Sequence, residues 1–320
     1  MTADVVITGG ATLAPGGGPV AAGALSGELR DRVARVERIS ALALAAGAGA
    51  LGDAGIDARL RRERAGVVFG TAFGCWLTNA EYQERFAVGG VGAASPRLFA
   101  ATVSNAAAGE VSIALGLAGP GITLTAGCAS GTVALGHAAA LVAAGDADLV
   151  LAGGIDALGP ALTAFLDAGG LAVGEPVDEA AALVVLEPPA AARERSARIR
   201  GLVLGHGAGF EPDPAAEDAG EGLAYAMRAA LAGAAADAFA TAAPRITRPL
   251  VERALRSVRG TGGIRRLAFE GAVGHSLGAA GPRTVMQVLE SEAPGTTVLI
   301  ADACPSGHAG ALVVRVGERT

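Results

Sequence analysis

Residues 123–154, TLTAGCASGTVALGHAAALVAAGDADLVLAGG, carry the strongest structural signal in the chain. An apolar strand ends at Thr125, an Ala-Gly pair makes a tight turn, and the apolar run 129–144 predicts a helix that Gly145 terminates. The next run, 149–153, is apolar throughout, as expected for a central strand that is covered on both faces. Strand, turn, helix and strand in this order indicate a layered α/β fold.

The same segment places Cys128 at the N-terminus of a helix. Unpaired backbone N–H groups and the helix dipole at that position stabilise a thiolate, and the same amides can hold an oxyanion on an attached acyl group. Gly131 leaves room for a substrate or another backbone to come close. The alternative interpretation is a buried structural cysteine, because free cysteine is commonly buried.

Strands alternate with helices on both sides of this segment. We expect strands at 5–8, 66–70, 122–125, 182–186, 196–205, 267–269, 297–301 and 311–316, and helices at 33–54, 103–117, 221–231, 249–258 and 278–289. Ser104 or Asn105 is expected to cap the second helix, and residues 11–31 to form a loop. The charged stretch 188–198 separates two comparable series of elements, and their alternation predicts a largely parallel sheet.

Composition excludes several classes of function. The 320 residues are 51% hydrophobic but only 3% aromatic, so the core is built from Ala, Val, Leu and Gly. No apolar run is long enough to span a membrane, and the start MTADVVITGG lacks the basic stretch of a signal peptide. The net charge is −6 and all basic residues are dispersed arginines, which argues against nucleic-acid binding. Three widely spaced cysteines give no disulfide framework and no metal-ligand spacing, and they predict a cytoplasmic protein.

Four segments resemble β-ketoacyl synthases. These are ITGGATLAP at 7–15, SNAAAGEVSIALGLAGPGITLTAG at 104–127, the Cys128 segment with its downstream GDADLVLAGG at 145–154, and GAVGHSLGAAG at 271–281. The resemblance implies a thiolase-like, five-layered αβαβα fold with two similar βα halves, residues 1–187 carrying Cys128 and residues 188–320 carrying His275. It implies that Cys128 accepts an acyl group, that His275 is a catalytic histidine, and that the site needs neither cofactor nor metal.

The sequence departs from the family at three places. The family's first histidine is expected in 237–252, DAFATAAPRITRPLVE, where Phe239 takes its position; Glu270 stands where the family has a lysine. A Glu near His275 favours imidazolium and repels a malonyl carboxylate. In the family's gating loop, here ACPSGHAG at 303–310, Pro305 stands near the position of the gating Phe, and His308 is the only candidate for a substitute histidine.

These departures bear on condensation, because two imidazoles normally hold the enolate oxygen that forms in the reaction. Losing one oxyanion donor costs on the order of a hundredfold in rate, so loss of a donor, a lysine and a gate argues against condensation by this chain alone. The remaining histidines have no role: His137 is expected in the core and His206 in a Gly-rich loop.

The resemblance therefore favours a chain-length-factor-like subunit that forms a heterodimer with an active ketosynthase in type II polyketide or fatty-acid-like elongation. Its second partner is an acyl carrier protein with a phosphopantetheine-bound acyl chain. The strand at 121–125 is expected to pair across the dimer axis and the Trp76 region to line the acyl tunnel. Two alternatives stay open. One is a stand-alone acyltransferase or thioesterase that uses a Cys128–His275 pair, and the other is a silent scaffold that docks carrier proteins.

Overall fold

Ten strands form one continuous sheet in the computed structural model, which describes residues 4–14, 27–57, 62–169, 171, 173–258, 261, 263–269 and 274–318. Their order across the sheet is β3-β2-β4-β5-β1-β6-β10-β9-β7-β8. The strands are β1 (Val5–Leu13), β2 (Ala65–Gly70), β3 (Gly121–Leu124), β4 (Leu149–Asp156), β5 (Ala180–Glu187), β6 (Gly201–Phe210), β7 (Ala238–Thr241), β8 (Arg265–Arg266), β9 (Thr297–Ala303) and β10 (His308–Val316).

The two halves of the sheet have the same topology. Counted from the seam between β1 and β6, the first half runs β1-β5-β4-β2-β3 and the second β6-β10-β9-β7-β8, so each places its first, fifth, fourth, second and third strand in that order. The seam is antiparallel and pairs Val5 with Val203 and Ile7 with Gly201. The predicted pair of similar βα halves is therefore confirmed.

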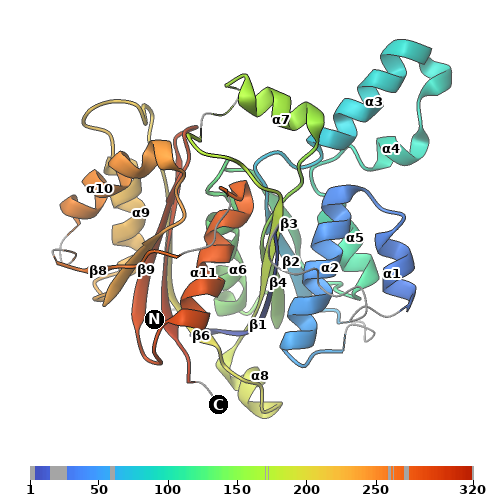
Figure 1. Ribbon diagram of the computed structural model, residues 1–320. Coiled ribbons are helices and arrows are strands. Elements are labelled where there is room, and N and C mark those ends of the chain that lie inside the picture. The colour runs from blue at the N-terminus through green and yellow to red at the C-terminus, as the bar shows by residue number, and fades with distance from the viewer. Residues whose placement is uncertain are drawn as a thin grey trace.

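Helices cover both outer faces and fill the middle (Figure 1). Helices α6 and α11 lie between the two halves of the sheet, α2 and α5 cover the outer face of the first half, and α9 and α10 cover that of the second. This is the expected five-layered αβαβα arrangement. The helices are α1 (Gly27–Val33), α2 (Arg38–Asp53), α3 (Trp76–Gly89), α4 (Pro96–Ala100), α5 (Ala106–Ala114), α6 (Ser130–Ala144), α7 (Pro160–Asp167), α8 (Pro189–Glu194), α9 (Glu221–Leu231), α10 (Arg248–Ser257) and α11 (Ala280–Ser291).

Alternation of side chains along the strands creates three cores. In β9, Val298 and Ile300 face the central layer with α6 and α11, whereas Leu299 and Ala301 face α9 and α10. In β2, Val68 faces the central layer and its neighbours face α2 and α5. A strand buried on both faces needs no polar alternation, which explains the continuous apolar runs in the sequence.

Small residues let the layers approach closely. In β6, glycines 205, 207 and 209 face α9, where an added Cβ would lie 2.0–2.1 Å from the carbonyl oxygens of Ala230, Ala226 and Gly222 respectively. Any side chain at these three positions would push the helix away from the strand. The scarcity of aromatic residues is thus matched by a close approach of α9 to β6 that only glycine allows at these positions.

The sheet is mixed, so the prediction of a largely parallel sheet is wrong. Parallel pairs join β2 to β3 and β4, and β7 to β8 and β9, whereas all other neighbours are antiparallel. The reason is that β9 turns directly into β10 without a crossover helix, and that the α7 segment between β4 and β5 lies beyond the end of the sheet (Figure 1).

Several local predictions also need correction. His206 lies in β6, not in a loop, because the Gly-rich stretch packs as a strand against α9. The strand expected at 267–269 forms at β8 instead. Asn105 occupies the N-cap of α5 without a side-chain hydrogen bond, and part of the loop expected at 11–31 belongs to β1 and α1. Helices α3, α4 and α7, which project beyond the layers in Figure 1, were not predicted.

Among the described residues, one helical stretch is long and apolar enough to be considered as a membrane span, residues 127–144, of which 61% is buried. It contains α6, which lies in the central layer between the two halves of the sheet. Because the sheet encloses this helix on both sides, we identify it as a core helix.

Candidate active site

The turn between β3 and α6 carries Cys128 and is fixed by Ser130. The Ser130 hydroxyl accepts a hydrogen bond from the Ala126 N–H at 2.7 Å, and lies 2.9 Å from the carbonyl oxygen of Thr71. Gly127 takes a left-handed conformation with φ of 54°, which reverses the chain before the helix. A Cβ at Gly131 would lie 2.2 Å from the carbonyl oxygen of Gly278, so the close approach of another backbone predicted here is confirmed.

Cys128 is sealed in the interior with no exposed surface. Its backbone N–H donates to the sulfur of Cys304 at 3.0 Å. Its side chain also hydrogen bonds to Cys304, and this contact together with burial raises the pKa of the Cys128 thiol well above its usual value. The expectation of a thiolate at Cys128 is therefore wrong, because the helix N-terminal amide is directed to the neighbouring sulfur instead.

Cys304 is the second sulfur of the site and comes from the turn between β9 and β10. Sequence reasoning did not identify it. Hydrogen bonds from the Cys128 side chain, from the Ser306 hydroxyl and backbone and from the Cys128 backbone outweigh burial and lower the pKa of Cys304 to about 6. The negative charge of the pair therefore belongs on Cys304.

An apolar cluster surrounds the two sulfurs. Its buried members are Val173 and Leu277, and Phe73 and Leu158 pack against it with part of their surface exposed. Phe73 also meets the ring of Phe165, with the centroids 6.2 Å apart. The sulfurs therefore lie in a largely apolar environment, and the carboxyl groups of Asp302 and Asp156 are near enough to contribute to the raised pKa of Cys128.

His275 lies in the turn that precedes α11, the counterpart of the Cys128 turn in the second half. Its Nε2 is 2.9 Å from the carbonyl oxygen of Ala242, and its Nδ1 accepts from the Leu277 N–H at 3.1 Å. Burial lowers the pKa of His275, so the ring is neutral with the proton on Nε2. Both ring nitrogens have backbone partners in this arrangement. Glu270, expected to favour the imidazolium, lies outside the described residues.

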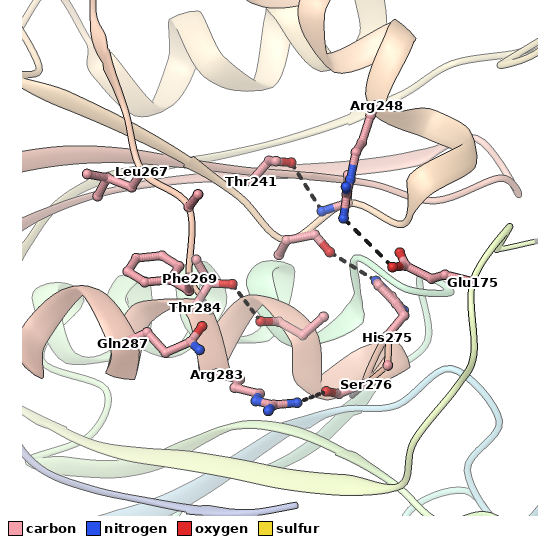
Figure 2. Close-up of a pocket in the computed structure, with 15 residues that line it drawn as sticks. Glu175, Thr241, Arg248, Leu267, Phe269, His275, Ser276, Arg283, Thr284 and Gln287 are labelled. Atoms are coloured by element: carbon pink, nitrogen blue, oxygen red, sulfur yellow. Dashed lines mark hydrogen bonds and ion pairs between the residues drawn. The ribbon is translucent and has the colours of Figure 1, made fainter. Parts of the chain in front are cut away.

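A cavity of about 320 Å³ opens beside His275 (Figure 2). Arg248 from α10 reaches toward Glu175 with an N···O distance of 3.8 Å, and Arg283 from α11 donates to the hydroxyl of Ser276 at 2.8 Å. Thr241 and Phe269 also line it, but neither cysteine does. The structure thus places Cys128 and His275 at the starts of the two central helices, with the cavity on the side of His275 alone.

Phe239, His137 and His308, which the sequence also marked as candidates, do not line this cavity. Phe239, at the expected position of the first histidine, is buried in β7 within the outer core of α9 and α10, and Arg266 lies 5.2 Å from its ring centroid. His137 is exposed on α6, so its predicted place in the core is wrong. His308 is partly exposed beside Ser306, at 3.2 Å between Nδ1 and Oγ.

Two fully buried carboxyl groups flank the central helices, and the sequence analysis did not identify them. Asp156, at the end of β4, accepts hydrogen bonds from Thr71 Oγ1 and from the N–H groups of Ala72, Phe73 and Gly278 at 2.8–3.0 Å. It joins the loop after β2 to the turn before α11. Asp302 in β9 accepts from Thr132 Oγ1 at 3.1 Å, with a smaller contribution from the Ala303 backbone, and its Oδ1 has no partner.

Within the described part of the chain, no group of three or more His, Cys, Asp or Glu residues is placed to hold a metal ion. The three cysteines are free. The functional groups that the described residues bring to this region are the thiols, one buried imidazole, two buried carboxyl groups and backbone amides.

Comparison with known proteins shows that the chain is similar in sequence to β-ketoacyl synthases. The profile of the β-ketoacyl synthase N-terminal domain matches residues 22–210. The chain is 29% identical over 290 residues to 3-oxoacyl-[acyl-carrier-protein] synthase 2 of Vibrio cholerae serotype O1, covering 79% of this chain and 70% of that protein. It is 35% identical over 232 residues to nodulation protein E of Rhizobium leguminosarum bv. trifolii, covering 71% of this chain and 53% of that protein.

Solved structures share the whole fold. The ishigamide ketosynthase/chain length factor superposes with a TM-score of 0.80 at 23% identity, covering 98% of this chain and 100% of that one. A type II polyketide synthase ketosynthase in complex with its acyl-carrier protein, AntDE:AntF, superposes with a TM-score of 0.81 at 20% identity, covering 99% and 100%. With a thiolase-like fold, a cysteine turn at the start of α6 and a family profile that spans more than half of it, the chain belongs to the β-ketoacyl synthase family.

Proposed function

We propose that this chain is a chain-length-factor-like subunit that pairs with an active ketosynthase and helps to shape the acyl tunnel during type II polyketide or fatty-acid-like elongation. It does not catalyse condensation itself. The partner ketosynthase and an acyl carrier protein with a phosphopantetheine-bound acyl chain complete the assembly. We place it in the cytoplasm, which fits its three free cysteines.

The observation that carries the proposal is the state of Cys128. Condensation requires a thiolate that an acyl group can reach and amide donors that are free to hold an oxyanion. Cys128 is completely buried, its pKa is raised by the Cys304 contact and by burial, and its N–H is bonded to the Cys304 sulfur. The buried, neutral His275 with both ring nitrogens bonded adds no free imidazole.

One edge of the sheet fits the proposed partner. Strand β3 ends the described sheet, pairs only with β2 and is partly exposed along its length. Helix α5 contacts β3 and exposes 71% of Ile113, and Val103 before this helix is also exposed. A strand whose outer edge has no neighbour in the described sheet, beside apolar side chains, suits a related subunit that adds its own strand and so continues the sheet across the pair.

The aromatic residues near Trp76 fit the tunnel role. Trp76, at the start of α3, lies with its ring centroid 6.0 Å from that of Phe165, which also contacts Phe73. Phe73 packs on the apolar cluster that encloses Cys128. This row of rings connects the cysteine pair with the exposed Phe165.

The test is co-expression with a complete ketosynthase that has a cysteine and both histidines. We expect a one-to-one complex on size-exclusion chromatography, and ketide product only when both chains and a loaded carrier protein are present. Ile113→Arg should weaken the complex at least tenfold. Tyr225→Arg, at another exposed apolar residue on α9, is the matched control and should not weaken it. A stable homodimer of this chain that makes ketide product alone would disprove the proposal.

A further inference from the structure

A cavity of about 330 Å³ lies between strand β1 and helix α11, and neither Cys128 nor Cys304 lines it. This volume is at the lower end of the range for small-molecule sites in proteins. The residues around the cavity come from two elements, Gly10, Ala11 and Thr12 from β1, and Arg283, Met286, Gln287 and Glu290 from α11.

Strand β1 forms one wall of the cavity. Side chains alternate along a strand, so Gly10 and Thr12 face the same side of the sheet. A Cβ at Gly10 would lie 2.3 Å from the Met286 sulfur, so the glycine lets this helix residue rest on the strand. The hydroxyl oxygen of Thr12 is buried without a hydrogen-bond partner among the described residues. A buried hydroxyl in this state is an unused donor at the edge of the cavity.

Helix α11 supplies two further donors, Arg283 and Gln287. They are one helical turn apart and share a face of the helix (Figure 2). Within the described part of the chain, Arg283 donates to the Ser276 hydroxyl at 2.8 Å and pairs with no carboxylate. The Gln287 carboxamide makes no hydrogen bond to the described residues. Three polar groups with spare donors therefore border one cavity.

The charge of Arg283 is not neutralised by the acidic residue of the same cavity. Glu290 is seven residues further along α11, which corresponds to about 10 Å along a helix. Its carboxylate also faces Arg200, with an N···O distance of 3.7 Å. The end of the cavity at Arg283 is therefore positive and rich in donors.

We propose that this cavity binds the carboxylate of a small organic acid through Arg283, Gln287 and Thr12. A guanidinium offers parallel N–H groups that match a planar carboxylate, and the amide and hydroxyl donate to its remaining acceptor positions. The aliphatic part of the acid lies against Met286, whose flexible side chain adapts to different shapes. The site does not rest on the proposed pairing with a ketosynthase, because all of its groups come from this chain.

The test is isothermal titration calorimetry of the purified chain with sodium hexanoate at pH 7.5. We expect one site per chain. Hexanol, which lacks the charge, and inorganic phosphate, which lacks the aliphatic part, should each bind at least tenfold more weakly. Arg283→Gln should weaken hexanoate binding at least tenfold. Arg228→Gln is the matched control and should leave it unchanged, because Arg228 is a helical arginine on α9 that pairs with Glu221.

Urea denaturation separates ligand binding from a structural role of Thr12. Without hexanoate, Thr12→Val should be at least as stable as wild type, because it removes a buried hydroxyl that has no partner and keeps the branched shape. Hexanoate should raise the urea midpoint of wild type, and should raise that of Thr12→Val less.

Four results would each overturn the proposal. These are no hexanoate binding by the folded chain at millimolar concentration, binding of hexanol or phosphate as tight as that of hexanoate, unchanged hexanoate binding by Arg283→Gln, and a loss of stability in Thr12→Val without hexanoate. None of these outcomes depends on complex formation with a ketosynthase.

Discussion

Asp302 and Asp156 are both completely buried, but their partners differ. Four donors surround Asp156, so it is ionised at neutral pH although burial raises its pKa to about 6. Asp302 has fewer donors, Thr132 Oγ1 and the Ala303 backbone, and burial raises its pKa to about 8, so it holds its proton at neutral pH. We therefore expect the two carboxyl groups to respond differently to pH and to substitution by asparagine.

Asp302 should make stability fall as pH rises. Its pKa in the folded chain lies above the unfolded value of about 3.9, so the folded state binds more protons between these values and stability is lost up to about pH 8. Asp302→Asn does not titrate. Its free energy of unfolding in urea, relative to wild type, should therefore rise by up to about 2 kcal/mol from pH 5.5 to pH 7.5. A constant difference over this range would contradict the assignment.

Asp156→Asn should destabilise the chain by about 2–3 kcal/mol at pH 7.5, because an amide presents N–H groups where four donors require an acceptor. Urea denaturation gives the measurement, and Asp302→Asn is the matched control for placing an amide at a buried carboxyl. Equal losses of unfolding free energy in the two variants would show that the hydrogen bonds of Asp156 do not account for its contribution to stability.

At the scale of elements, β6 and α9 show how glycine sets the distance between layers. Gly207→Ala should cost about 2–3 kcal/mol, since its Cβ would lie 2.1 Å from the Ala226 carbonyl oxygen. Gly121→Ala, in strand β3, meets no atom within 4 Å and should stay within about 0.5 kcal/mol of wild type. Thermal and urea unfolding of the two variants compare them directly. Equal losses would show that backbone entropy, and not the close approach, determines the effect.

The sequence predicted the elements whose signal is local. The Cys128 turn, the helix after it and the strand at β4 follow from one stretch of about thirty residues, and the structure places them as expected. The partner of Cys128 was not predictable in this way, because Cys304 lies 176 residues further along the chain. The signal that could have found it is ACPSGH, with thiol, hydroxyl and imidazole two residues apart.

Exposed or irregular elements were missed for a related reason. Helices α3 and α7 project from the layers, so tertiary packing imposes little periodicity on them. His137 was expected inside, but it is exposed on α6. Hydrophobic content alone does not tell which position of a core helix reaches the surface.

At the scale of the whole molecule, the two halves depend on each other. Helix α6 belongs to residues 1–187, but it contacts β6 and β10 of residues 188–320 as well as β2 and β4 of its own half. Expressed separately, each half should lack cooperative urea unfolding, and co-expression should restore it. Circular dichroism of the two purified fragments is the measurement. A fragment that unfolds cooperatively alone would instead be an independent domain with a boundary at residue 187.

The position of β1 has a consequence for synthesis on the ribosome. This strand is made long before its neighbours in the sheet, since Val6 pairs with Glu187 in β5 and Val5 with Val203 in β6. At about 5–20 residues per second, the nascent strand waits on the order of ten seconds or more for a partner. During that time an apolar, unpaired segment is available to chaperones or to neighbouring chains, so translation speed and chaperone supply should govern the yield of folded protein.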